Sequence, residues 1–233
     1  MRRALLALLC GWAAGMAGAE TPRIALDVGH FHARPGATSA RGVPEFAFNL
    51  RLAQDIAAAL EQAGAEVRLI GADGRAEELA ARAPLAGGSR LLLSIHHDSV
   101  QPRYLRTWQV DGEARSYSDR FRGFSLFVSA RNPLEARSLL CAASIGRALR
   151  RAGFAPTRHH AKTIPGEARP WADYAAGVHY HDELIVLRTA EVPAVLLEAG
   201  VIVHRQEETL LSQEAHRRRM AAAVAQGALA CIE

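Results

Sequence analysis

Short apolar runs alternate along this chain with segments that we expect to be helical. The runs are Arg23–Val28, Glu66–Ile70, Arg90–Ile95, Gly123–Ser129, Glu183–Arg188 and Ala194–Gly200, and the helical segments are Glu45–Ala65, Glu77–Arg82, Pro133–Phe154 and Ser212–Ile232. Runs that are almost wholly apolar indicate strands covered on both faces of a parallel sheet. We therefore predict an α/β fold: a single domain with a mostly parallel, twisted sheet of about six strands and helices on both faces.

Two long polar segments, Gln101–Arg122 and Ala155–His181, interrupt this alternation. Connections of this length in a compact domain are usually functional lids or mobile segments. We interpret both as loops, the second being an insert at about 155–181 with a short helical pattern around Trp171–Ala176.

The first 19 residues have the pattern of a cleaved signal peptide: Arg2 and Arg3, an apolar stretch, and the small residues Ala17-Gly18-Ala19. We predict a mature chain of residues 20–233 that is periplasmic or secreted. A membrane anchor is the alternative, but the apolar stretch is short for a span, so we expect no integral membrane segment after cleavage.

The charge of the chain bears on its class of binding partner, and its cysteines bear on whether it contains a disulfide. The formal net charge is +4, and the arginines are scattered without a basic stripe and interleaved aromatics, so we predict no nucleic-acid partner. A pI of about 9.3 suits an anionic polymer. Cys141 and Cys231 either form one disulfide in an oxidising compartment or are separately buried on their own helices.

Candidate catalytic residues gather after the predicted strands. In an open α/β sheet, ligands bind beyond the carboxyl ends of the strands. His30 follows the first strand, His96 follows the third, and Glu198 ends the last, while Glu45 opens the first long helix. Two histidines and one carboxylate with one position left for water form a recurrent catalytic zinc set. We predict that His30, Glu45 and His96 bind one Zn²⁺ per chain and that Glu198 is the catalytic base.

Four ordered blocks strengthen this assignment: "IALDVGH" ending at His30, "E-x-x-x-N-L" at Glu45–Leu50, "SIH" at Ser94–His96, and "VPAVLLEAG" at Val192–Gly200. Together they resemble the signature blocks of the zinc-dependent N-acetylmuramoyl-L-alanine amidases, the peptidoglycan amidases of cell separation and wall turnover. The resemblance covers nearly the whole mature chain.

The resemblance implies hydrolysis of the amide between N-acetylmuramic acid and L-alanine, with zinc on His30, Glu45 and His96, and Glu198 essential for activity. It implies peptidoglycan as the partner of a monomer, with an activator protein as a further partner in some relatives. Two alternatives remain: a catalytically silent, wall-binding or regulatory relative, and a zinc peptidase that cuts elsewhere in the stem peptide.

The chain departs from the family pattern after "SIH", at His97 and Asp98. Because consecutive side chains on a strand point to opposite faces, we expect His96 to face the metal and His97 to turn away. Asn49, one helical turn after Glu45, either orients Glu45 or makes a local polar contact.

The insert offers further candidate residues. It is either a substrate-binding loop or, as in some relatives, an inhibitory segment, here with Glu167 as the occluding ligand. Its histidines form a loosely spaced candidate for a second metal site: His159, His160, His179 and His181.

Overall fold

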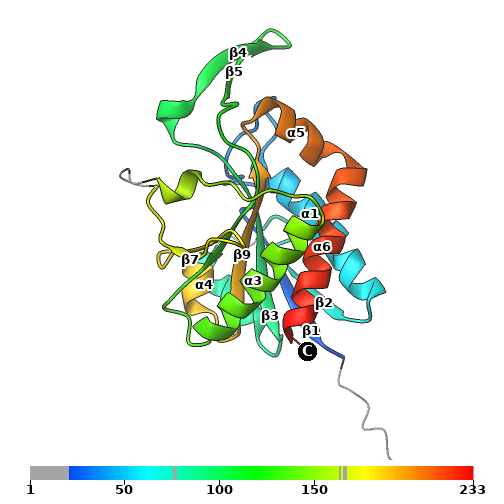
Figure 1. Cartoon of the computed structure of the whole chain (residues 1–233). Coiled ribbons are helices and arrows are strands. Elements are labelled where there is room, and N and C mark those ends of the chain that lie inside the picture. The colour runs from blue at the N-terminus through cyan, green and yellow to red at the C-terminus, as the bar shows by residue number, and fades with distance from the viewer. Residues whose placement is uncertain (1–20, 76–77, 163, 165–166, 233) are drawn as a thin grey trace, which may run out of the picture.

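A seven-stranded mixed sheet forms the centre of the computed structural model, which describes residues 21–75, 78–162, 164 and 167–232 (Figure 1). Its order is β2-β1-β3-β9-β6-β8-β7. The strands are β1 (Arg23–Val28), β2 (Glu66–Ile70), β3 (Leu91–Asp98), β6 (Ser125–Val128), β7 (Trp171–Asp173), β8 (Val178–Tyr180) and β9 (Ala194–Val201). The first four strands in this order are parallel, and β6 is antiparallel to β9. The predicted fold class is confirmed, with seven strands in place of about six.

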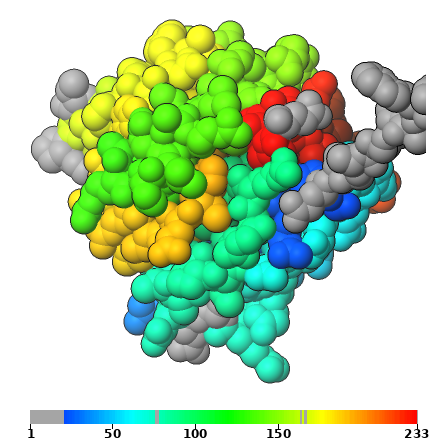
Figure 2. Space-filling view, turned by 90° about the horizontal axis from the view of Figure 1, so that it is seen from below, coloured from blue at the N-terminus to red at the C-terminus, as the bar shows by residue number. Residues whose placement is uncertain are grey.

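Helices cover both faces of the sheet. One face carries α1 (Glu45–Gln62), α3 (Glu135–Arg151) and α6 (Glu214–Ile232), and the other carries α4 (Ile185–Thr189) and the 3-10 turn η1 (Ala83–Ala86), next to α2 (Leu79–Arg82). The disulfide Cys141–Cys231 joins α3 to α6, which decides between the two interpretations of these cysteines. At the end of the molecule where β1 begins, the start of β1 lies beside the end of α6 (Figure 2).

The two faces of β3 have different roles. Leu91, Leu93 and Ile95 belong to the core under α1, α3 and α6, whereas Leu92 packs with the α4 side. Side chains alternate along a strand, so His96 falls on the α4 side and His97 on the α1 side. The alternation of the apolar residues at the start of β3 therefore determines which face of the sheet His96 and His97 point to.

Several elements differ from the prediction. Glu183–Arg188 was predicted as a strand, but it contains most of α4, because a short apolar run suits a buried helix as well as a strand. Trp171–Ala176 was predicted as helical, yet Trp171 opens β7, which pairs antiparallel with β8. The predicted closing helix Ser212–Ile232 corresponds to α6, and the prediction missed a separate helix before it, α5 (Arg205–Ser212).

The Gln101–Arg122 segment is a hairpin that stands out from the body of the molecule (Figure 1), formed by β4 (Arg106–Val110) and β5 (Glu113–Tyr117). Asp111 and Gly112 both have positive φ, as a tight hairpin turn requires. The Asp-Gly pair was a hairpin signal that the loop interpretation overlooked.

Parts of the sequence prediction lie outside the described residues. The signal peptide, residues 1–19, does so entirely, and the predicted helix Glu77–Arg82 is described only from Glu78 onward, where it contains α2. Among the described residues, every helix is too short or too polar to cross a membrane.

Candidate active site

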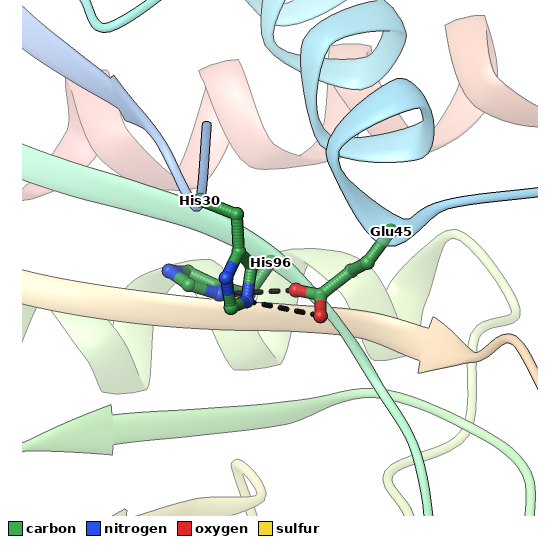
Figure 3. A group of neighbouring side chains, drawn as sticks. All are labelled: His30, Glu45 and His96. Atoms are coloured by element: carbon green, nitrogen blue, oxygen red, sulfur yellow. Dashed lines mark hydrogen bonds and ion pairs between the residues drawn. The ribbon is translucent and has the colours of Figure 1, made fainter. Parts of the chain in front are cut away.

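His30, Glu45 and His96 converge at the carboxyl ends of β1 and β3 (Figure 3). The Glu45 carboxylate lies between the two rings, with Oε2 3.0 Å from His30 Nε2 and Oε1 3.1 Å from His96 Nδ1. The candidate ligand atoms all lie within 4.8 Å of one another. Three residues that are far apart in sequence thus present two imidazole nitrogens and one carboxylate to one point.

A buried ion pair holds the backbone of His30. His30 has φ +68°, a left-handed conformation that is costly for a residue with a side chain. The Arg82 guanidinium donates to the carbonyl oxygens of Val28 and His30, each at 2.6 Å, and pairs with Asp27 at 2.6 Å. Ser94 donates to the other oxygen of Asp27. Asp27 therefore acts on the His30 segment through Arg82, a residue that no sequence motif singled out.

Hydrogen bonds fix the orientation of Glu45 at the start of α1. The backbone N–H of Ala37 donates to Oε2 at 3.0 Å, and Asn49 Nδ2 donates to Oε1 at 3.2 Å. Burial raises the pKa of Glu45, but hydrogen bonds and charge from His30 and His96 outweigh it, so the pKa is lowered. Glu45 is thus held as a carboxylate, the form that binds cations.

His97 points away from this group and is almost fully buried. Its Nδ1 lies 2.8 Å from Asn49 Oδ1, and its ring packs against Phe48. Burial lowers the pKa of His97 to about 3, so the ring is neutral. A neutral imidazole whose Nδ1–H donates to Asn49 Oδ1 orients that amide, which in turn donates to Glu45. Asn49 therefore contacts Glu45, as the helical spacing indicated.

Two glycines make room for the site. A Cβ at Gly29 would overlap the His96 ring, and one at Gly36 would overlap both the Glu45 carboxylate and the His30 ring. Gly36 also has φ +80°. At these two positions the backbone therefore approaches the candidate ligands more closely than a residue with a side chain would allow.

Glu198 lies beside His96 on the neighbouring strand β9, where the two residues are register partners. Its Oε2 is buried and has no hydrogen-bond partner among the described residues. Burial, with the charges of Asp98 and Glu45, raises the pKa of Glu198 well above its usual range. A carboxyl group with raised proton affinity next to a candidate metal site is suited to proton transfer.

A family model described as N-acetylmuramoyl-L-alanine amidase matches residues 24–230. The chain belongs to this amidase family. No curated protein matches the chain.

Solved amidases share the fold. The N-acetylmuramyl-L-alanine amidase Ami1 from Mycobacterium smegmatis superposes with a TM-score of 0.70 at 20% identity, over 91% of this chain and 96% of its own. The catalytic domain of CwlV, an N-acetylmuramoyl-L-alanine amidase from Bacillus (Paenibacillus) polymyxa var. colistinus, gives 0.66 at 24% identity, over 89% and 96%. The CwlD amidase from Clostridioides difficile, in complex with the GerS lipoprotein, gives 0.63 at 19% identity, over 91% and 98%. The prediction of a peptidoglycan amidase is confirmed by the family match, and the structures confirm its fold.

The insert places a second group of candidate ligands in the amidase. Asp98 Oδ2 lies 3.1 Å from His159 Nε2 and 2.7 Å from His160 Nε2. His179, which the sequence had grouped with these histidines, instead stacks on Trp171 with ring centroids 3.8 Å apart. Glu167, the predicted occluding ligand, is not part of the His30–Glu45–His96 group. No sequence signal linked Asp98 to the insert, because 62 positions separate it from His160.

Proposed function

We propose that this amidase is zinc-dependent and hydrolyses the amide between N-acetylmuramic acid and L-alanine, releasing stem peptides during wall remodelling or daughter-cell separation. The observation that carries the proposal is the convergence of His30, Glu45 and His96 beside Glu198 in a chain of the amidase family.

The donor set fits zinc. Two imidazole nitrogens and one carboxylate are typical ligands of a catalytic zinc ion that keeps a position open. Hydrogen bonds from Ala37 and Asn49 orient Glu45, as such bonds commonly orient metal ligands. Gly29 and Gly36 leave room for the side chains of the three candidate ligands. When bound, zinc supplies a Lewis acid that activates water and polarises the scissile carbonyl.

Protein residues supply the proton transfer and the orientation of the ligands. Glu198 accepts a proton at its unpartnered Oε2 from the attacking water, and it then donates that proton to the leaving amine of L-alanine. The Arg82–Asp27 pair holds the His30 backbone, and Asn49 holds Glu45, so neither ligand has to reorganise during the reaction.

We also propose that the protein acts as a monomer in the periplasm or outside the cell, after removal of residues 1–19. The Cys141–Cys231 disulfide supports this location, because disulfides persist in oxidising compartments. We further propose that a partner protein activates the enzyme, since the CwlD amidase, which shares this fold, forms a complex with the GerS lipoprotein.

The test is digestion of purified sacculi followed by mass spectrometry. We expect stem peptides with a free N-terminal L-alanine, and we expect Glu198→Gln to lower their rate of release roughly 100- to 10,000-fold while retaining bound zinc. Glu61→Gln, on the exposed surface of α1, is the matched control.

The metal ligands are tested separately. His30→Ala should lose one zinc ion per chain, whereas His32→Ala, an exposed histidine two residues away, should not. Near-normal peptide release by Glu198→Gln would refute the assignment of the base. Fragments cut within the stem would indicate a peptidase, and the absence of any product from the wild type would indicate a silent relative.

A further inference from the structure

The Asp98–His159–His160 group has the same donor types as the first site. Asp98 ends β3, and both histidines belong to the 3-10 turn η3 (His159–Ala161) in the insert. Their candidate ligand atoms lie within 4.8 Å of one another, and both Nε2 atoms point to one oxygen of Asp98. Two imidazoles and one carboxylate suit divalent ions of borderline softness.

Both histidines of the group are held by contacts that leave their Nε2 atoms directed toward Asp98. Thr157 Oγ1 lies 2.9 Å from His159 Nδ1, a position from which it can accept the Nδ1–H and leave Nε2 free for a metal. The His159 ring stacks on Phe121, and the His160 ring packs edge-on against Phe127. The group is therefore preorganised.

The surrounding cavity has an excess of buried carboxylate. It has a volume of about 350 Å³, and Asp98, Glu167 and Glu198 all line it together with both histidines. Both oxygens of Glu167 and Oε2 of Glu198 are buried and have no hydrogen-bond partner among the described residues. Arg169 also lines the cavity and supplies one positive charge against these three carboxyl groups. Buried carboxylates without partners are costly unless a cation offsets them.

We propose that Asp98, His159 and His160 bind a second divalent metal ion, of the class that includes Zn²⁺, next to the proposed catalytic site. His96 and Asp98 lie two residues apart on the same face of β3, so their Cα atoms are about 7 Å apart. The second ion therefore lies in the wall of the cavity that contains Glu198. The departure from the family pattern at Asp98 and the histidine pair of the insert are then two parts of one site.

The test is zinc stoichiometry on the mature protein, stripped with a chelator and equilibrated with Zn²⁺ alone. We expect two ions per chain in the wild type, one in His159→Gln/His160→Gln, and one in His30→Ala. His181→Gln is the matched control, because His181 lines the same cavity outside the group and should leave two ions bound.

A second measurement does not depend on how well the variants fold. Wild-type crystals soaked in Zn²⁺ should show an anomalous peak between Asp98, His159 and His160. Binding of a single ion that is lost in His30→Ala would overturn the second site, and so would a second ion that survives the double substitution. A single ion that survives His30→Ala but not the double substitution would support the second site and refute the proposed first one.

Discussion

The buried Arg82–Asp27 pair offers the sharpest test of how the fold holds the candidate site. Both side chains are only about 1% exposed, and three of the acceptors of Arg82 lie on Asp27, Val28 and His30. We predict that Arg82→Met lowers the free energy of unfolding by about 3–5 kcal/mol, because it leaves a buried carboxylate without its counter-charge. Ser94 still donates to Asp27, but one neutral donor does not replace a guanidinium.

The double variant makes the reasoning refutable. Asp27→Asn removes the charge that Arg82→Met leaves uncompensated, so Asp27→Asn/Arg82→Met should be more stable than Arg82→Met alone. Arg68→Met is the matched control: Arg68 is exposed on β2, and its loss should change stability by less than about 0.5 kcal/mol.

Urea unfolding of the metal-free proteins at pH 7 measures these differences through the midpoint and slope of each transition. Arg82→Met should also bind zinc at the first site roughly 10- to 100-fold more weakly, because the His30 backbone is released. A loss of less than about 1 kcal/mol in Arg82→Met, or a double variant less stable than the single one, would refute this account.

Three further perturbations follow from the structure. Gly36→Ala should weaken zinc binding measured by competition with a chelator, since its Cβ would displace the Glu45 carboxylate; unchanged affinity would mean that the loop moves freely. Burial raises the pKa of Glu207 from 4.5 to about 7, so the folded protein binds the carboxyl proton of Glu207 more tightly than the unfolded chain does. The stability that this proton contributes is therefore lost as pH rises from 4.5 through 7. Relative to the wild type, Glu207→Gln should gain stability over that window by up to roughly 3 kcal/mol, seen in unfolding curves at several pH values. Replacing Cys141 and Cys231 by alanine should lower the free energy of unfolding by roughly 4–5 kcal/mol, because the bond closes a loop with a sequence separation of 90; equal stability of the oxidised and reduced wild type would contradict this.

Local sequence signals predicted those parts of the molecule that depend on local periodicity. The apolar run before His96 specified a buried strand, and the i, i+4 spacing of Glu45 and Asn49 specified their contact on α1. The short run that became α4 carried no such signal, since five residues are compatible with either periodicity.

The roles of Arg82 and of the insert histidines could not be predicted because they arise from contacts between segments that are distant in sequence. Arg82 is one of 28 basic residues, and only its burial against Asp27 distinguishes it from a solvated arginine. Likewise, His159 and His160 read as part of a loosely spaced histidine set until the fold brought them to Asp98. In both cases the informative quantity is a contact between segments that are distant along the chain.

At the end of β3, the register of the strand determines the face of the sheet to which each of His96, His97 and Asp98 points. Leu91, Leu93 and Ile95 face the core under α1, which fixes the alternation before the polar residues begin. His96 then faces Glu45, while His97 faces Asn49 on the opposite side and supports Glu45 through it. Asp98 returns to the first face and meets the insert histidines. A shift of one residue would bury His96 and Asp98 under α1 and turn His97 into the cavity, so the register set by the apolar half of the strand is required for both proposed metal sites. His97→Ala should therefore leave zinc bound at both sites, because it removes a support of Glu45 and not a ligand, whereas a shifted register would make it empty one of them.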